Sequence, residues 1–308
     1  MLSAYITHPS SLLHEMGPDH PESPERVSAI NDHLLNHGLL DFMQSYAAPA
    51  ATRAQVERVH TGLYVAELVA GAPTSGYSRT DPDTLMNPHT LDAAWHAAGA
   101  AVLATELVAR GEAPTAFCNV RPAGHHATRG AGMGFCFFNN VAVGIAHALA
   151  ECSIERVALI DFDAHHGNGS EDIFAGDERV LMVSTFERGL YPYNGEVPIG
   201  PNMCNVPLDR YSRGDALRDA VAKHWWPALD AFRPQMVFLS AGFDAHREDD
   251  MSRLMWVDGD YAWLTREIMS IAERHARGRV VSLLEGGYAL SALARSAAAH
   301  VRVLIGAD

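Results

Sequence analysis

Short apolar runs that do not alternate with polar residues are the feature of this sequence that most restricts its fold. They lie at residues 115–120, 157–162, 180–184, 236–240 and 280–284, and each is partly β-branched. Such runs are shorter than an average helix and lack the alternation of a half-exposed strand. They predict strands that are buried on both faces, as in a parallel sheet.

The segments between these runs carry helical patterns. The stretch LDAAWHAAGAAVLATELVAR (residues 91–110) is rich in alanine and lacks proline, so it predicts a helix that packs closely through small residues. Further helices are predicted to begin near Val27 and to span residues 141–151, 215–232, 261–276 and 290–305. Strands that alternate with helices form βαβ units, which predicts a three-layer α/β/α fold around a parallel sheet.

The length and composition favour one globular domain over residues 1–308. A chain of 308 residues is long for one domain, but α/β folds with large sheets reach this size. Hydrophobic residues make up 48% of the chain and charged residues 19%, which suits a large core. No repeat or long linker divides the sequence, and residues 14–26 and 71–83 are predicted to be irregular segments of the same domain.

The charge and cysteine content argue against several kinds of protein. The net charge of −14 disfavours a nucleic-acid-binding surface, which depends on clustered Lys and Arg. The 4 cysteines have no CxxC spacing, so neither a disulfide framework nor a thiolate zinc site is indicated. The sequence has no signal-like N-terminus and no apolar stretch of transmembrane length, so we expect a cytoplasmic protein with no membrane partner. Whether the chain forms a homo-oligomer is left open.

Polar clusters directly follow several of the predicted strands. They are RPAGHH (residues 121–126), DFDAHHGNG (161–169), GFDAH (242–246) and EGGY (285–288). In parallel α/β sheets, ligands bind outside the carboxyl ends of the strands. The clusters therefore predict one functional site at that edge of the sheet.

Asp163, His165 and Asp244 are the candidate metal ligands. Asp163 and His165 lie two residues apart in or just beyond a strand, so their side chains point to the same side. Asp244 follows another strand and adds a third ligand, which leaves an open position for water or substrate, as catalytic zinc requires. Iron, cobalt or manganese would also suit these ligands. Taken alone, Asp163 and His165 could instead cap the next helix.

The adjacent residues His125 and His126 could supply the base and the acid that amide hydrolysis needs. Asp161 shares the face of Asp163 but lies one step deeper, where it could orient an imidazole rather than bind metal. Tyr288 follows paired glycines, which could bring its hydroxyl over the metal to stabilise an oxyanion. The alternative for Tyr288 is an ordinary turn with a packed ring.

The glycine-rich segment GAGMGFCFFNN (residues 130–140) predicts a helix entry with Phe137 and Phe138 in the core. Phe135 lies nearer the glycines than these two residues do. Gly134 and Phe135 are the candidates for binding substrate. Phe135 would line an apolar channel, and Tyr191 in the segment GLYPYNG is the candidate for the opposite wall.

The motifs RPAGHH, GFCFFNN, DFDAHHGNG, SAGFDAH and LEGGY, in this order and over most of the chain, resemble the histone deacetylase family and its bacterial relatives, including acetylpolyamine amidohydrolases. HPESPER (residues 20–26) and the glutamate before GGY are similar to the class II branch. The resemblance implies the arginase/deacetylase fold, with an eight-stranded parallel sheet. It also implies a zinc-dependent amidohydrolase that removes acetyl groups.

The resemblance also implies roles for individual residues. His125 would pair with Asp161, His126 would be the general base and acid, and Tyr288 would polarise the acetyl carbonyl. Zinc would bind Asp163, His165 and Asp244, while Phe135 and Tyr191 would flank the acylated chain. Asp83 matches a rim acid that holds substrate backbone amides, although from the residues alone it is equally a turn Asp. Potassium would bind backbone oxygens of Asp161, Asp163 and His165 near Ser184, and a second potassium would lie near Phe174.

Asn168 departs from the class I relatives, in which an Asp partners the second histidine. A neutral partner should make His126 harder to protonate, which favours this residue as a base at neutral pH.

Several functions compete with this interpretation. A binuclear manganese ureohydrolase shares the fold but needs further bridging carboxylates, and a silent module would bind acetylated ligands without cleaving them. Among deacetylase substrates, acetyl-lysine competes with acetylated polyamines. Acetyl-lysine is the preferred prediction, because residues 248–250 (Glu-Asp-Asp) are predicted to be a solvated turn rather than an acidic gatekeeper for cations.

Overall fold

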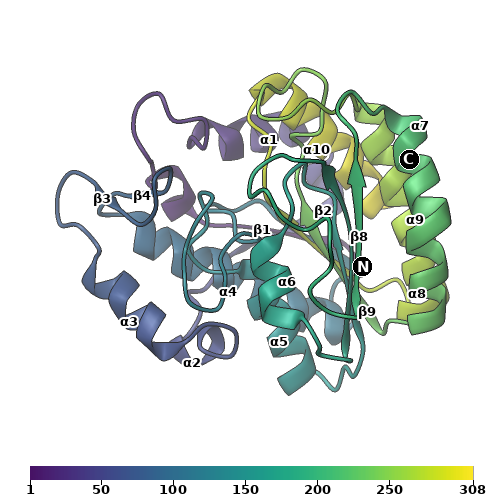
Figure 1. Cartoon of the computed structure of the whole chain (residues 1–308), viewed down its shortest axis with the longest axis horizontal. Helices are drawn as coiled ribbons and strands as arrows, with labels where there is room; N and C mark the ends of the chain where they lie inside the picture. Colours follow the sequence, from purple (N-terminus) through teal and green to yellow (C-terminus); the bar gives the residue numbers. More distant parts are fainter. Residues whose placement is uncertain (308) are drawn as a thin grey trace.

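An eight-stranded sheet runs through the computed structural model, which describes residues 1–307 (Figure 1). Its order from edge to edge is β2-β1-β5-β10-β9-β6-β7-β8, and every neighbouring pair is parallel. The strands are β1 (Ser3–Thr7), β2 (Met43–Ala47), β5 (Thr115–Cys118), β6 (Val157–Asp161), β7 (Val180–Glu187), β8 (Met203–Leu208), β9 (Met236–Ala241) and β10 (Val280–Leu284). The eight-stranded parallel sheet is therefore confirmed.

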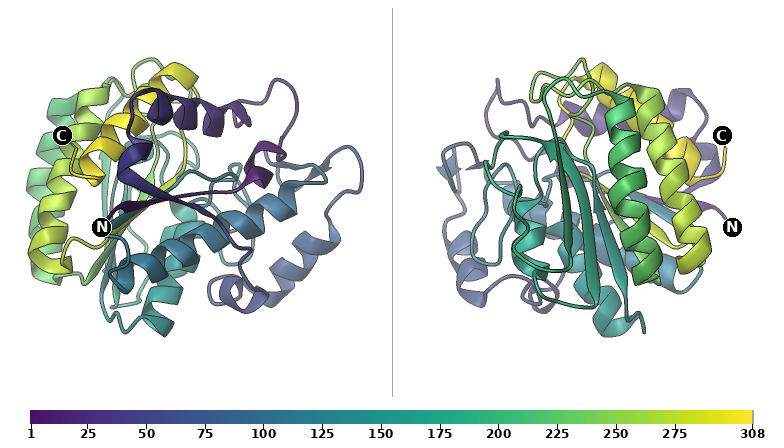
Figure 2. Two further views of the ribbon diagram at one scale, coloured as in Figure 1. Left: turned by 180° about the vertical axis from the view of Figure 1, so that it is seen from behind. Right: turned by 45° about the vertical axis from the view of Figure 1, so that its right-hand side comes forward.

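Helices cover both faces of this sheet, which confirms the three-layer prediction (Figure 2). One face packs against α4 (Thr90–Ala109) and α5 (Asn140–Glu151), and the other against α1 (Glu25–Asn36), α9 (Asp258–Ala276) and α10 (Leu290–Leu304). The remaining helices are α2 (Arg53–Val56), α3 (Gly62–Ala70), α6 (Asn168–Phe174), α7 (Gly214–Ala220) and α8 (Trp226–Phe232). Within residues 1–307, no helix is long and apolar enough to cross a membrane.

The central strands are buried on both faces, which explains why their sequences do not alternate. In β9, Met236 and Phe238 belong to the core on the α4 and α5 side, whereas Val237 and Leu239 belong to the core on the α9 side. All four side chains are fully buried. Both sets of positions must therefore be apolar.

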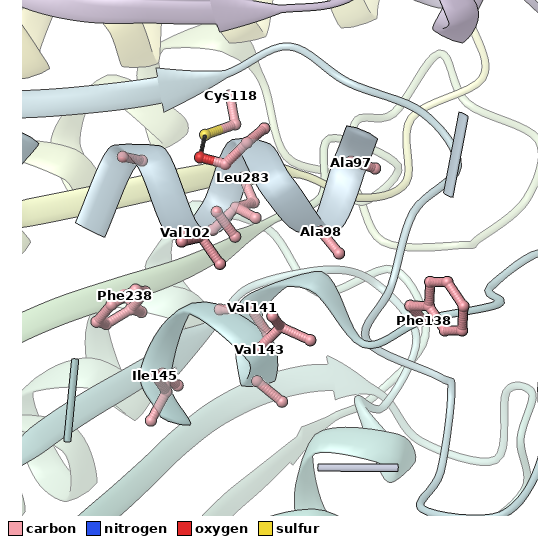
Figure 3. Close-up of a cluster of buried hydrophobic side chains, with 14 of the residues drawn as sticks. Ala97, Ala98, Val102, Cys118, Phe138, Val141, Val143, Ile145, Phe238 and Leu283 are labelled. Atoms are coloured by element: carbon pink, nitrogen blue, oxygen red, sulfur yellow. Dashed lines mark hydrogen bonds between the residues drawn. The ribbon is translucent and has the colours of Figure 1, made fainter. Parts of the chain in front are cut away.

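The small residues of α4 allow close contact with α5 (Figure 3). The Gly144 carbonyl of α5 accepts a hydrogen bond from Thr105 of α4 at 3.4 Å. A Cβ at position 144 would lie 3.2 Å from the Ala101 Cβ, so even an alanine there would make a tight contact with α4. Close packing of the Ala-rich helix is thus confirmed.

Some elements differ from the sequence-based expectation. Strands β2 and β8 were not predicted because they form the two edges of the sheet and have partly exposed side chains. Strand β1 was missed as well, although it is almost fully buried. The predicted helix over residues 215–232 is continuous, but its middle, Val221–Trp225, is π-helical.

The sheet order places the motif-bearing strands side by side. Strands β5, β10, β9 and β6 are consecutive neighbours, and each is followed by one of the polar clusters. Because the strands are parallel, these clusters share one edge of the sheet. A short hairpin of β3 (Ser78–Arg79) and β4 (Leu85–Met86) also reaches this region, through hydrogen bonds to the loop at Gly134.

Candidate active site

Candidate metal ligands meet at the carboxyl ends of the central strands. Asp163 and His165 follow β6, and Asp244 follows the neighbouring strand β9. His165 Nδ1 lies 3.1 Å from Asp163 Oδ1 and 2.9 Å from Asp244 Oδ2. The side chains are buried, and their ligand atoms lie within 4.8 Å of one another. One ion can therefore contact all of them at once.

A positive charge at its centre stabilises this group of side chains. Burial alone would lower the pKa of His165, but the facing carboxylates of Asp163 and Asp244 raise it to about 10. Two adjacent buried carboxylates repel each other, and a cation between them removes the repulsion. A protonated imidazole is one such cation. A divalent metal ion is another, and two carboxylates with one imidazole are ligands of a catalytic zinc site.

Backbone amides hold the two carboxylates in place. Gly286 N–H donates to Asp163 Oδ2 at 2.7 Å, and Ala164 N–H donates to Asp244 Oδ1 at 2.9 Å. Position 286 must be glycine, because a Cβ there would lie 2.3 Å from Asp244 Oδ2. The loops after β6, β9 and β10 are thus tied together through the candidate ligands.

His125 and Asp161 form a buried pair. His125 Nδ1 donates to Asp161 Oδ2 at 3.0 Å, and neither side chain is appreciably exposed. Burial opposes protonation of His125, but the negative charges of Asp161 and Asp163 raise its pKa to about 10. In this environment His125 carries a positive charge at neutral pH. It therefore suits an electrostatic role better than the role of a base.

His126 has the opposite environment. Its Nδ1 lies 2.8 Å from Asn168 Oδ1, while the Asn168 amide nitrogen faces the Met133 sulfur at 3.5 Å. An oxygen acceptor requires the proton on Nδ1, which leaves the Nε2 lone pair free. Burial and the nearby His125 and His165 hold the pKa of His126 well below its ordinary value. This imidazole is neutral at pH 7 and can accept a proton, as a general base must.

Tyr288 follows β10 and lies at the same site. Its ring meets Phe135 edge-on at 6.1 Å between centroids, and the Arg26 guanidinium carbon lies over the ring at 4.9 Å. Arg26 is fully buried, and its Nε donates to the Gly287 carbonyl at 2.6 Å. Burial raises the pKa of Tyr288 well above its ordinary value, so the hydroxyl stays protonated and can donate a hydrogen bond.

A pocket of about 170 Å³ opens onto these groups. It is lined by Asp83, His126, Gly134, Phe135, His165, Tyr191, Tyr193, Met251 and Tyr288. The sequence had predicted the candidate substrate residues Asp83, Gly134, Phe135 and Tyr191, but it did not predict Tyr193 or Met251. The volume is well below the roughly 300–1,000 Å³ of pockets for drug-sized ligands. It suits one slender, unbranched chain.

The Gly134 wall of the pocket has an unusual backbone. The φ angles of Gly134 and Phe135 are +55° and 69°, in the left-handed region. A Cβ at position 134 would lie 2.5 Å from the His126 ring, so only glycine fits there. Gly134 N–H donates to Asp81 at 3.2 Å and Phe135 N–H donates to Thr84 at 2.9 Å. Both acceptors lie between β3 and β4, so the hairpin positions this wall.

A buried ion-pair network beneath the site was not predicted from the sequence. The Glu22 carboxylate accepts hydrogen bonds from Arg26 and Arg121, and these side chains have no exposed surface. Burial alone would raise the pKa of Glu22, but Arg121, His14 and Arg26 together hold it well below its ordinary value. Arg26 also binds the Tyr288 loop through the Gly287 carbonyl. Residues 14–26, which were predicted only as an irregular segment, are therefore part of the scaffold of the site.

Glu285 joins three strand ends. Its Oε2 accepts hydrogen bonds from the N–H groups of Gly124 at 2.7 Å and His125 at 3.1 Å, and its Oε1 accepts one from Ser240 at 3.1 Å. Burial raises the pKa of Glu285 to about 7. The sequence marked this residue only as a feature of the class II branch. In the structure it connects the ends of β5, β9 and β10.

The prediction of a solvated turn over the acidic residues 248–250 is wrong for one of them. Glu248 pairs with Arg295 at 2.9 Å and Asp250 is exposed, but Asp249 is only 6% exposed. The prediction fails for Asp249 because its carboxylate accepts hydrogen bonds from backbone amides of a distant loop. None of these acids is among the residues that line the pocket.

The residues of the first predicted potassium site lie together beside the metal ligands. Asp161 and Ser184 are partners in the register of β6 and β7, and Asp163 and His165 follow β6 directly. These residues are buried, and Asp161 is the last residue of β6. Their backbone oxygens are the kind of ligand that hard cations prefer.

The surroundings of Phe174, the second predicted potassium position, are different. The Asn202 side-chain amide donates to the Phe174 carbonyl at 2.8 Å. The same nitrogen donates to the carbonyls of Asp177 at 3.2 Å and Val180 at 2.8 Å. The Asn202 amide thus already supplies hydrogen-bond donors to these carbonyl oxygens.

A second group of metal-type side chains, His8, Asp92 and His96, does not line the pocket. The His8 and His96 rings are stacked at 3.6 Å. His8 Nδ1 accepts the Ser10 N–H at 3.2 Å, which places the proton of a neutral His8 on Nε2. The remaining nitrogen is therefore a donor rather than a metal ligand, and we assign no metal site to this group.

Comparisons with known proteins agree with the geometry. The sequence-family model of the histone deacetylase domain matches residues 20–304 of this chain. The chain belongs to the histone deacetylase family. A probable deacetylase of Archaeoglobus fulgidus is 34% identical, covering 94% of this chain and 82% of its own. A histone deacetylase-like amidohydrolase of Pseudomonas aeruginosa is 37% identical, covering 87% and 72%.

A solved structure gives the same result for the fold. The crystal structure of the HDA15 HD domain superposes with a TM-score of 0.91 at 30% identity, covering 99% of this chain and 90% of that one. The chain therefore has the arginase/deacetylase fold of a histone deacetylase domain. It is a hydrolase that acts on amide bonds, in a family that is generally metal dependent.

Proposed function

We propose that this chain is a zinc-dependent deacetylase that hydrolyses the acetyl amide of Nε-acetyl-lysine in peptides or proteins. The observation that carries the proposal is the buried group of Asp163, His165 and Asp244 next to a neutral His126 and a protonated Tyr288, in one narrow pocket. These parts meet the needs of amide hydrolysis, which are an activated water, a base that becomes an acid, and a donor for the oxyanion.

Bound zinc would supply Lewis acidity, which polarises the acetyl carbonyl and makes water easier to deprotonate. His126 Nε2 accepts the proton of the attacking water while Asn168 holds the Nδ1 proton. The same imidazolium then donates the proton to the leaving amine. Tyr288 O–H donates a hydrogen bond to the carbonyl oxygen as negative charge develops there. His125, which is paired with Asp161, carries its positive charge next to the His126 ring.

The shape of the pocket supports a linear acyl-aminoalkyl substrate. Phe135 and Tyr191 flank the chain, and Gly134 leaves space beside the His126 ring. Asp83 is exposed at the pocket, where its carboxylate can accept hydrogen bonds from the backbone amides of a peptide. An acetylated polyamine has no such amides to offer. We therefore rank acetyl-lysine above acetylpolyamines, with acetylpolyamine amidohydrolase as the alternative.

Other parts of the proposal concern ions and organisation. We assign residues 1–308 to one catalytic domain, since a single sheet carries all the clusters of the site. Backbone oxygens of Asp161, Asp163 and His165 near Ser184 are proposed to hold a structural potassium ion. We propose no ion at Phe174, because Asn202 already donates to the carbonyl groups there.

The test uses purified protein, first stripped with a chelator and then given back Zn²⁺. Turnover should disappear and return with the metal. Asp244→Ala leaves two protein ligands and should lose both stoichiometric metal and activity, whereas the exposed Asp250→Ala should retain both. Acetyl-lysine peptides should be hydrolysed faster than acetylputrescine or acetylspermidine. Full zinc retention and activity in Asp244→Ala would contradict the metal assignment, and faster polyamine hydrolysis would favour the alternative substrate.

A further inference from the structure

The loop that carries Tyr288 is held at both ends by carboxylates. It begins after β10, which ends at Leu284, and it leads into α10, which begins at Leu290. At its start, Gly286 N–H donates to the candidate metal ligand Asp163 at 2.7 Å. At its end, the N–H groups of Tyr288 and Ala289 donate to one oxygen of Asp249, at 2.6 Å and 3.0 Å.

Asp249 also binds a second residue of the pocket lining. Its second oxygen accepts the Met251 N–H at 3.0 Å, and Met251 lines the pocket beside Tyr288. The carboxylate thus joins two pocket residues that come from different strand ends. Between the two anchors lies Gly287, whose φ of +120° is open only to glycine and whose backbone has little preference of its own. The position of the phenol therefore depends on the anchors.

The surroundings of Asp249 argue against direct contact with a cationic substrate. The residue is 6% exposed and does not line the pocket. Both of its oxygens already accept backbone N–H groups. A carboxylate used in this way has little capacity left for an ammonium group, whereas its neighbour Asp250 is exposed.

We propose that Asp249 is a positioning residue, which fixes the Tyr288 hydroxyl where charge develops on the substrate carbonyl. The inference rests on the proposed function, because it requires Tyr288 to act as the oxyanion donor. Asp249 acts through Tyr288 and has no contact of its own with the reacting atoms. Loss of the anchor should leave the metal bound and the hydroxyl present, but the hydroxyl should shift relative to the metal.

Two substitutions remove different amounts of this anchor. Asp249→Ala removes all its hydrogen bonds. Asp249→Asn keeps one oxygen for the N–H groups of Tyr288 and Ala289 but turns an NH₂ group toward the Met251 N–H. The asparagine variant should therefore lie between the wild type and the alanine variant. Asp250→Asn is the matched control, since it changes the neighbouring exposed acid in the same way.

The experiment measures kcat and KM for an acetyl-lysine peptide, with the variants in both wild-type and Tyr288→Phe backgrounds. Asp249→Ala should lower kcat about 10- to 100-fold, the scale of a misplacement of about 1 Å, with a KM change below about threefold. In the Tyr288→Phe background the same substitution should lower kcat less than about threefold further, because residues that act as a unit are not additive. Zinc content and Tm are measured for every variant, and Asp249→Asn carries the test if the alanine variant does not fold.

The outcomes separate this inference from the proposed function. A normal kcat for Tyr288→Phe would contradict the proposed mechanism itself. A slow Tyr288→Phe with a normal Asp249→Ala, or an equal loss in both backgrounds, would overturn only the role of Asp249. If Asp249→Ala raised KM for acetylspermidine alone and left kcat unchanged, Asp249 would bind the substrate cation, which also overturns the inference.

Discussion

Asn168→Asp should move the activity of this enzyme to higher pH. The wild-type amide oxygen accepts the His126 Nδ1 proton at 2.8 Å, and the pKa of His126 lies well below its ordinary value because of burial and the nearby His125 and His165. In the proposed mechanism the neutral His126 accepts a proton, so activity should be lost only as the pH falls through this low pKa. A carboxylate at position 168 favours the imidazolium and raises that pKa.

The structure allows the size of the shift to be worked out. Two unit charges about 4 Å apart interact by roughly 4 kcal/mol at an effective dielectric constant of about 20, which corresponds to roughly 3 pK units. Burial of the new carboxylate opposes part of this, so the expected rise is about 1–3 units. The same protein contains a natural comparison in His125, whose pKa is raised to about 10 by its partner Asp161 at 3.0 Å together with Asp163.

The assay is kcat/KM against pH for the wild type, Asn168→Asp and the control Asn36→Asp, which changes an exposed residue at the end of α1. The acid limb of Asn168→Asp should move up by about 1–3 units, while the control follows the wild type. Zinc content should be equal in all of them. A profile that superimposes on the wild type would refute either the role of His126 as base or the role of Asn168 as its partner.

Further predictions concern the oxyanion donor and the scaffold. Tyr288→Phe should keep zinc content and Tm, since Arg26 still lies over the ring, but should lower kcat by about 10²–10³; a normal kcat would remove the hydroxyl from the mechanism. Glu22→Gln should cost about 3–5 kcal/mol of unfolding free energy in urea titrations, because Arg26 and Arg121 lose a buried partner. The pKa of Glu22 is depressed in the folded protein, so its contribution to the free energy of unfolding is present above the ordinary glutamate pKa and is lost as the pH falls towards the folded-state pKa. The wild type should therefore lose more stability on acidification than Glu22→Gln, and an equal loss in both would contradict this. Asn202→Ala leaves three carbonyl groups without the amide, so Tm should fall, and KCl should restore part of it; an unchanged Tm would contradict the role of Asn202.

The grouping of the candidate metal ligands could be predicted because it depends on local patterns. Asp163, His165 and Asp244 each follow a short buried strand, and the rule that parallel strands end at one edge is enough to bring them together. Phe137 and Phe138 were correctly placed in the core by their position after the glycines, and both are buried. The edge strands β2 and β8 were missed because partly exposed strands give no continuous apolar run.

The supporting carboxylates could not be predicted, because each acts on a segment far away in the sequence. Glu22 binds Arg121 across 99 residues, and Asp249 binds the Tyr288 loop across 39 residues. No periodicity or spacing connects such pairs, and the residue type alone does not distinguish a buried Asp or Glu from an exposed one. Yet these groups and Glu285 hold the loops on which the chemistry depends. A chain with every catalytic motif but without the Asp249 anchor should therefore still bind metal and yet turn over slowly, so motifs alone do not establish an efficient enzyme.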